Sequence, residues 1–191
     1  MSPCGRYRLE IEEYATEGAD FALAIVRRTA DGQEVATIKR NDSRCFYTWV
    51  SRAGRDYLLF PEDLEGQTVI DLTAGQMASF SSPDDPFIWA EYYLSPGTTK
   101  LAVVGCYWAC PYQVTVYDFH DPLSLPLPKL AKFVLPENDA KFGEWVSEGV
   151  FQVRRKDGAV SVFEVPGGRQ GESAPADVTM DVKRRLRDDA R

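Results

Sequence analysis

The residue types used in acid–base catalysis are sparse in this chain of 191 residues. His120 is its one histidine, so a Ser/His/Asp or other histidine-based mechanism would have to use it. Asp118 and Asp121 flank His120, and one hypothesis is a hydrolase that combines these residues with a loop carboxylate. However, adjacent strand residues point to opposite faces, and Asp121-Pro122 after a strand is typical of an ordinary turn. No Gly-x-Ser-x-Gly nucleophile motif is present, and we infer no enzyme activity.

Cysteine spacing suggests a second kind of chemistry. Cys106 and Cys110 are separated by three residues, and they could form a loop disulfide or supply two ligands to a zinc ion. A closed zinc site needs four ligands, whereas the other two cysteines are isolated in the sequence. The pattern therefore favours packed thiols, and it predicts neither a metal nor a cofactor.

An aromatic loop offers a binding surface in place of a catalytic site. Tyr107, Trp108 and Tyr112 surround Pro111 in this loop. Tyrosine and tryptophan dominate the energetics of protein interfaces, so an exposed cluster of these rings would bind another protein. The alternative is that the rings form core beneath the loop. The acidic pair Glu62 and Asp63 lies on a proline-flanked loop, and we expect it to act together with the aromatic residues.

The net charge of the chain restricts the class of partner that it can bind. The chain has a net charge of −7, and the tail after Pro166 holds six basic and five acidic residues, which leaves about −8 on the body. This balance disfavours nucleic acid and anionic lipid, and it favours a basic protein partner. No apolar run is long enough to cross a bilayer and no signal-peptide pattern is present, so we expect a cytoplasmic protein. The sequence leaves the partner's identity and the oligomeric state open.

Short strand patterns must position these residues. Lys100 to Tyr107 and Val114 to Phe119 flank the aromatic loop, and similar patterns recur from Arg6 to Val165. Asp31-Gly32 between two of them predicts a hairpin. No segment of the body has a helical period, and the proline-spaced stretch from Leu123 to Asp139 is expected to be extended. The sequence predicts one all-β domain at 1–166 and a flexible charged tail at 167–191.

An internal repeat connects these strands. The fragments AIVRRTADGQ, TVIDLTAGQ, VTVYDFHDP and VSVFEVPGG end in similar strand-then-turn patterns, which places the positions of Arg27, Asp71, Asp118 and Glu164 in register. Spacings of 44, 47 and 46 residues separate these positions.

The repeat resembles β-propeller blades of the WD-repeat-like kind over about residues 51–128. The best-matching pieces are Ser51 to Phe80 and Ser95 to Pro128, although Gly-His and Trp-Asp pairs are absent from the chain. The resemblance implies an antiparallel β-meander of about four blade-like hairpin units. A small closed propeller, an open array of blades and a β-sandwich would share this pattern. The function that this reading favours is a non-catalytic module for protein–protein interaction.

Overall fold

The computed structural model describes residues 1–135, 140–155 and 158–167. Fourteen β-strands and no helix occur in that part of the chain, which therefore contains no helix that could span a membrane. The bounds of the strands are β1 Tyr7–Thr16, β2 Ala19–Arg28, β3 Glu34–Arg40, β4 Thr48–Arg52, β5 Arg55–Leu59, β6 Gln67–Asp71, β7 Gln76–Phe80, β8 Ile88–Leu94, β9 Lys100–Tyr107, β10 Ala109–Asp118, β11 Lys129–Val134, β12 Ala140–Ser147, β13 Val150–Arg155 and β14 Val160–Glu164. Residues 168–191, most of the predicted tail, lie outside the described residues.

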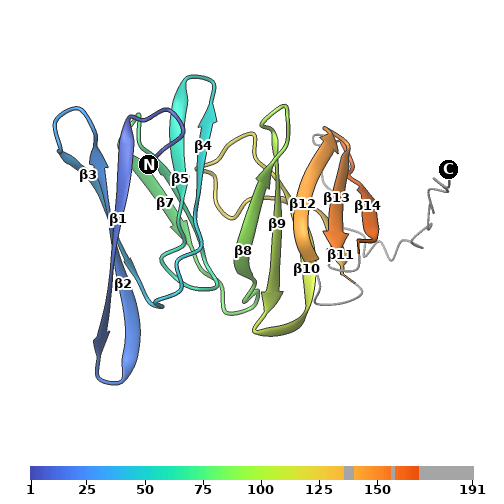
Figure 1. Cartoon of the computed structure of the whole chain (residues 1–191), viewed down its shortest axis with the longest axis horizontal. Coiled ribbons are helices and arrows are strands. Elements are labelled where there is room, and N and C mark those ends of the chain that lie inside the picture. The colour runs from blue at the N-terminus through green and yellow to red at the C-terminus, as the bar shows by residue number, and fades with distance from the viewer. Residues whose placement is uncertain (136–139, 156–157, 168–191) are drawn as a thin grey trace.

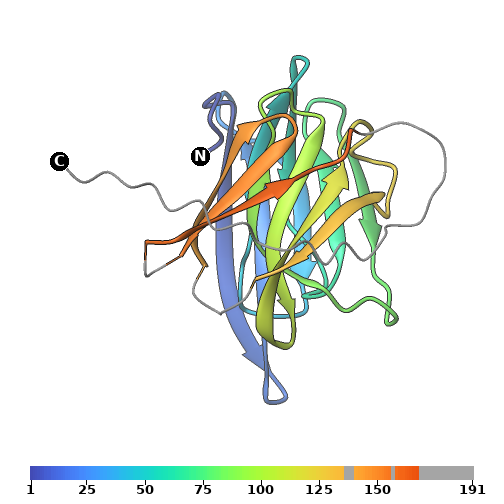
Figure 2. The same ribbon diagram turned by 90° about the vertical axis from the view of Figure 1, so that its right-hand side faces the viewer.

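The strands form four antiparallel sheets in chain order. The first sheet is β1-β2-β3, the second β4-β5-β6-β7, the third β8-β9-β10-β11 and the fourth β12-β13-β14. Within each sheet, every strand pairs with its neighbour in sequence, as in a meander, and Gly32 takes a φ of 72° in the predicted β2–β3 hairpin turn. The sheets stand side by side in a row, with the first and fourth at opposite ends (Figures 1 and 2). This arrangement is an array of blades and not a two-layer sandwich.

Three apolar clusters join the four sheets, one at each junction. Ala24, Val26 and Ile38 of the first sheet meet Leu58 and Ile70 of the second. The largest cluster contains Tyr57, Leu59 and Val69 of the second sheet and four aromatic residues from the third sheet and its strand ends, which are Phe87, Trp89, Tyr117 and Phe119. Phe151, Val153 and Phe163 of the fourth sheet pack on Val104 and Val116 of the third in the last cluster. The hydrophobic core is therefore divided into slabs between the sheets.

Strand patterns reflect these positions. β6 and most of β9 are buried on both faces, because the second and third sheets have a neighbour on each side. By contrast, β2 and β14 alternate between buried and more exposed residues, because an end sheet is covered on one face only.

The repeat predicted from the sequence coincides with the sheets. In the second and third sheets, the fourth strand (β7 or β11) leads into the next sheet. β3 does the same in the first sheet, so β1, β2 and β3 correspond to the second, third and fourth strands of a four-strand unit. Arg27, Asp71, Asp118 and Glu164 consequently all lie on a third-place strand. The predicted alignment is one residue off in the first sheet, because the Thr29 amide donates to the Arg6 carbonyl as the Leu72 amide does to the Asp56 carbonyl, which makes Arg28 the counterpart of Asp71. Asp71 and Asp118 also share a local structure, because each carboxylate accepts a hydrogen bond from the amide two residues ahead, at 2.9 Å. Arg27 instead forms ion pairs with Glu10 and Glu34.

The carboxylate of Glu148 connects the third and fourth sheets through hydrogen bonds. Glu148, in the β12–β13 turn, accepts hydrogen bonds from the Ser95 hydroxyl at 2.7 Å, the Thr99 hydroxyl at 2.6 Å and the Gly97 amide at 2.8 Å. Burial alone would raise the pKa of Glu148, but these bonds and the nearby Lys100 ammonium hold the pKa below its usual range. The ionised carboxylate therefore stabilises the folded state.

Candidate functional site

Trp108 is the single residue between β9 and β10, at the tip of a tight hairpin. Its φ of 58° lies in the left-handed region, which a bulky side chain rarely adopts. The side chain is 64% exposed, although tryptophan is usually well buried. A strained backbone that holds a large ring in solvent is typical of a functional position.

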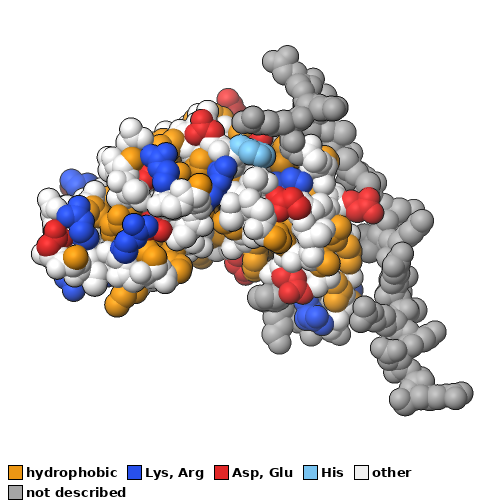
Figure 3. All heavy atoms as spheres, turned by 90° about the horizontal axis from the view of Figure 1, so that it is seen from above, with side chains coloured by type: hydrophobic (Ala, Val, Ile, Leu, Met, Phe, Trp, Pro, Cys, Tyr) orange, Lys and Arg blue, Asp and Glu red, His pale blue; other side chains and the backbone are white. Residues whose placement is uncertain are grey.

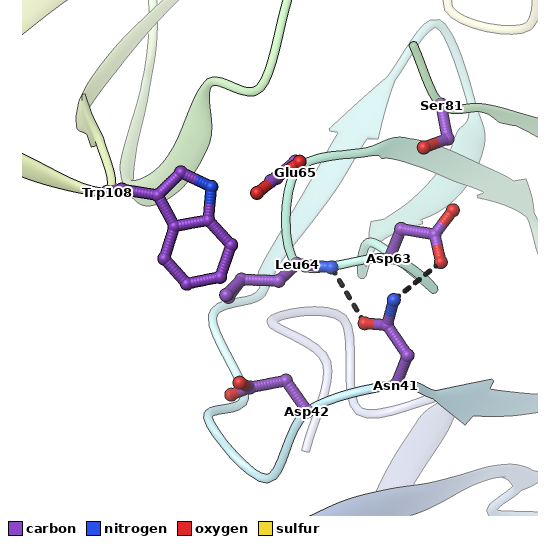
Figure 4. A pocket seen from close by; sticks show the side chains of 7 residues that line it. All are labelled: Asn41, Asp42, Asp63, Leu64, Glu65, Ser81 and Trp108. Carbon is purple, nitrogen blue, oxygen red and sulfur yellow. Dashed lines mark hydrogen bonds between the residues drawn. The ribbon is translucent and has the colours of Figure 1, made fainter. Parts of the chain in front are cut away.

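A pocket of about 290 Å³ lies beside this ring. Segments that are distant in sequence line it: the connection after β3, the β5–β6 loop, the residue after β7 and the β9–β10 tip. Figure 4 shows the indole of Trp108 on one side of the pocket and the side chains of Asn41, Asp63 and Ser81 on the other. The lining residues are Asn41, Asp42, Asp63, Leu64, Glu65, Ser81 and Trp108.

Asn41 holds two of these segments together. Its side-chain amide donates to Asp63 Oδ1 at 2.8 Å, and its side-chain oxygen accepts from the Leu64 amide at 2.9 Å. The Asn41 amide also donates to the Glu62 carbonyl at 3.0 Å. Because both ends of the side chain are engaged, the β5–β6 loop has a fixed position relative to the first sheet.

Arg40 connects two segments next to the pocket-lining residues. Only 1% of this residue is exposed, and the guanidinium donates to the Arg44 carbonyl at 2.5 Å and to the Pro61 carbonyl. It also lies 5.8 Å from the centre of the Phe60 ring. Burial lowers the pKa of Arg40, but a guanidinium stays charged at neutral pH.

The pocket is acidic. Asp42, Asp63 and Glu65 bring three carboxylates to it, whereas Arg44 is the basic residue that pairs with one of them. The Arg44 side chain donates to both Asp42 oxygens at 2.9 Å, and this hydrogen bonding holds the pKa of Asp42 below its usual range. An acidic pocket with an exposed indole can hold a cation by Coulomb attraction and by cation–π contact.

The structure separates the predicted aromatic residues. Tyr107 turns away from Trp108: its hydroxyl donates to Asp85 Oδ1 at 2.8 Å, its ring packs on Phe87, and burial raises its pKa. Tyr112 packs against the cluster between the third and fourth sheets. Of the three rings, Trp108 alone lines the pocket.

The two residues of the predicted acidic pair, Glu62 and Asp63, lie in different surroundings. Asp63 lines the pocket, whereas Glu62 accepts a hydrogen bond from the Ser79 hydroxyl at 2.6 Å and braces the loop against β7. Sequence reasoning missed the lining residues Asn41, Asp42, Leu64, Glu65 and Ser81 as members of one site. Glu65 adjoins the predicted pair, but nothing in the sequence connects it to Asn41 or Trp108.

The residues of the hydrolase hypothesis lie elsewhere. The Nδ1 atom of His120 is 2.6 Å from Asp118 Oδ1, and the same oxygen accepts the His120 amide. The backbone carbonyl of His120 accepts from Arg52 at 3.0 Å, and Asp121 is exposed. Among the described residues that line the acidic pocket there is no histidine. The hydrolase hypothesis stays a prediction.

The cysteine pair is described in part. Cys106, at the end of β9, is half-buried, and the side chain of Cys110 lies outside the described residues. Within the described part of the chain, no group of three or more His, Cys, Asp and Glu side chains is arranged to hold a metal ion.

Comparison with solved structures identifies the architecture. The chain superposes on the C-terminal WD40 domain of Sif2 with a TM-score of 0.55 and 18% identity, over 83% of this chain and 46% of that one. The β-propeller domain of Myceliophteria thermophila Cps50 (Swd1) gives a TM-score of 0.51 and 11% identity, over 84% of this chain and 55% of that one. The fold is that of WD40 propeller blades. The four sheets are the blades, which confirms the all-β class and the WD-repeat-like resemblance.

A relative in sequence is uncharacterized protein R762 of Acanthamoeba polyphaga mimivirus. It is 31% identical over 128 residues, which cover 64% of this chain and 50% of the viral protein. The match thus spans about half the length of that relative. No protein-family model matches the chain.

Proposed function

We propose that this protein is a non-catalytic interaction module whose acidic pocket beside Trp108 binds a basic segment of a partner protein. The observation that carries the proposal is the exposed indole on a strained hairpin tip, next to Asp42, Asp63 and Glu65. The partner would place a lysine or arginine side chain in the pocket and stack it on the indole.

The pocket chemistry supports this choice of ligand. A cation over a tryptophan face gains about 0.5–2 kcal/mol, depending on how far it is desolvated. Carboxylates around the entrance add attraction and discriminate against acidic ligands. Asp42 already pairs with Arg44, and Asp63 accepts from Asn41. Glu65 is therefore the carboxylate that we expect to contribute most to a new ion pair.

The charge of the whole chain supports the same class of partner. At −7, the chain attracts basic proteins over a distance of about one Debye length, roughly 8–10 Å at physiological salt. This attraction raises the association rate more than the final affinity. Binding should consequently weaken as the ionic strength rises.

The experiment measures binding of fluorescent peptides that differ in one central side chain, Lys, Arg, Gln or Glu, by anisotropy. We expect the Lys and Arg peptides to bind and the Gln and Glu peptides to bind far more weakly. Trp108→Ala should weaken binding by about 2 kcal/mol, or roughly thirtyfold in Kd, as for a central interface residue. Glu65→Gln should weaken it less and should reduce its salt dependence.

Two matched variants serve as controls. Met77→Ala removes another exposed apolar side chain, 49% exposed on β7, and Asp20→Asn removes an acidic charge at the start of β2. Both should bind as the wild type does. Equal binding of Lys and Glu peptides, or an unchanged Kd for Trp108→Ala, would contradict the proposal. Affinity capture with mass spectrometry, comparing wild type and Trp108→Ala, would then identify the partner.

A further inference from the structure

The two end blades each have one face that no described blade covers. On the first sheet this face, called here the first end face, carries a central row of half-buried apolar residues on β2, which are Phe21, Leu23 and Ile25. On the fourth sheet the corresponding last end face carries valines from all three strands. The exposed fractions are 58% for Val146, 40% for Val160 and 57% for Val162, and Val150 is half-buried.

These faces are intermediate between a core and a solvated surface. Along β2 and β14, buried residues that point into the neighbouring cluster alternate with residues that point to the end face. Several of these outward residues are apolar, as expected of a face that contacts a partner. Charged side chains surround them: Figure 3 shows acidic and basic groups interspersed with apolar ones over the end formed by the first sheet. An apolar centre with a polar rim is the usual anatomy of a protein interface.

We propose that a second copy of this chain covers both faces, so that two four-blade arrays close one eight-blade ring. The described blades form an open row in which the first and fourth sheets stand at opposite ends (Figure 1). They superpose on 46% of the Sif2 WD40 chain while using 83% of this one. A second array of the same size would supply the other half of a ring.

Symmetry makes the arrangement closed. A two-fold axis along the centre of the ring brings the last end face of each copy against the first end face of the other, which forms two identical interfaces. No end face then remains free to extend the row into a filament. Each new interface repeats the type of junction that already joins neighbouring blades inside the chain.

The two faces carry one pair of complementary charges. Glu12 and Lys39 flank Leu23 on the first end face, as the strand register shows. Arg154 and Glu164 lie on the last end face, and among the described residues none of these four forms an ion pair within the chain. β1 and β13 both hold the second place in their blades, which sets Glu12 opposite Arg154. Lys39 and Glu164 do not form a second such pair, because Lys39 is level with Leu23 on β2, whereas Glu164 is level with the end of β2 at Arg28.

The test measures the mass of the full chain by light scattering after size-exclusion chromatography. The chain has a mass of 21.5 kDa, and we expect a species of twice that mass. Leu23→Glu and Val162→Glu should each give a monomer, because a buried glutamate in either face breaks both interfaces. Val134→Glu makes the same change at a valine that is 60% exposed on β11, outside both faces, and should leave the dimer intact.

Mixing the two monomeric variants distinguishes the proposed geometry from others. In the ring, one interface of a mixed pair joins two unaltered faces, so the mixture should form a heterodimer that neither variant forms alone. Likewise, Glu12→Arg and Arg154→Glu should each weaken the dimer, and the double variant should restore it. If either face variant stays dimeric, the dimer does not join unlike faces and the proposal fails.

A monomeric wild type would also overturn the proposal. If a wild-type monomer became dimeric only when residues 168–191 were removed, that segment would be the occupant of an end face in place of a second copy. None of these variants touches the residues that line the acidic pocket. The peptide-binding result and the oligomeric state can therefore fail independently of each other.

Discussion

Replacing Trp108 by asparagine should weaken peptide binding roughly thirtyfold, as Trp108→Ala does, and leave the free energy of unfolding within about 1 kcal/mol of the wild type. Asparagine adopts the left-handed conformation that the hairpin tip requires at a φ of 58°. The substitution thus separates the contribution of the indole to binding from its contribution to stability.

Two opposing effects set the expected stability change. A buried tryptophan covers roughly 200 Å², and a residue that is 64% exposed keeps about a third of that area covered, which is worth about 1.7 kcal/mol at 25 cal/mol per Å². Against this loss, asparagine relieves about 1–2 kcal/mol of left-handed strain. The two effects nearly cancel.

Urea denaturation followed by circular dichroism measures the change, with Trp89→Ala as the contrast. Trp89 is 2% exposed in the core, and its truncation should cost about 3–5 kcal/mol. A loss above about 2.5 kcal/mol for Trp108→Asn would refute the reasoning, because the indole would then be a structural element and not a binding group.

Two further predictions concern the blades themselves. Gly105→Ala should cost at least about 3 kcal/mol and lower the melting temperature sharply, because a Cβ there would lie 2.0 Å from the Ile88 carbonyl oxygen; Gly167→Ala, where no atom of the described residues lies within 4 Å of the added Cβ, should have little effect. Glu148 has a lowered pKa, so its contribution is present above the ordinary glutamate value near 4.5 and is lost as the pH falls through the folded-state pKa. Urea titrations at several pH values should show wild type more stable than Glu148→Gln at neutral pH, with the difference shrinking below about pH 4.5; a constant difference would contradict this assignment.

Much of the fold was predictable from local pattern. Most strand patterns, the Asp31-Gly32 hairpin and the positions equivalent to Asp71 depend on residues that are close in sequence, so the all-β class and the blade repeat could be inferred. β11 shows where such reasoning stops. It lies within the proline-spaced segment from Leu123 to Asp139 that was expected to be extended, and its identity as a sheet strand depends on pairing with β10.

The site was predicted only in part. An exposed aromatic and an acidic loop were expected, and Trp108 and Asp63 do meet in one pocket. Tyr107 and Tyr112 were expected beside Trp108, but a single tight turn points adjacent side chains of a hairpin in different directions. The sequence alone could not show which of the three rings faces solvent.

The order of apolar and polar residues along the chain determined that it forms pleated strands, where most of them turn and how often the unit recurs. Only the packing of the blades decided which loops from different sheets meet, because Asn41, Asp63, Ser81 and Trp108 line one pocket from three sheets and are not connected by any spacing along the chain. The faces of a sheet exist only after its strands have paired, and the hydrophobic effect then determines which faces are buried. For that reason the pocket and the two uncovered end faces could be found only in the tertiary structure.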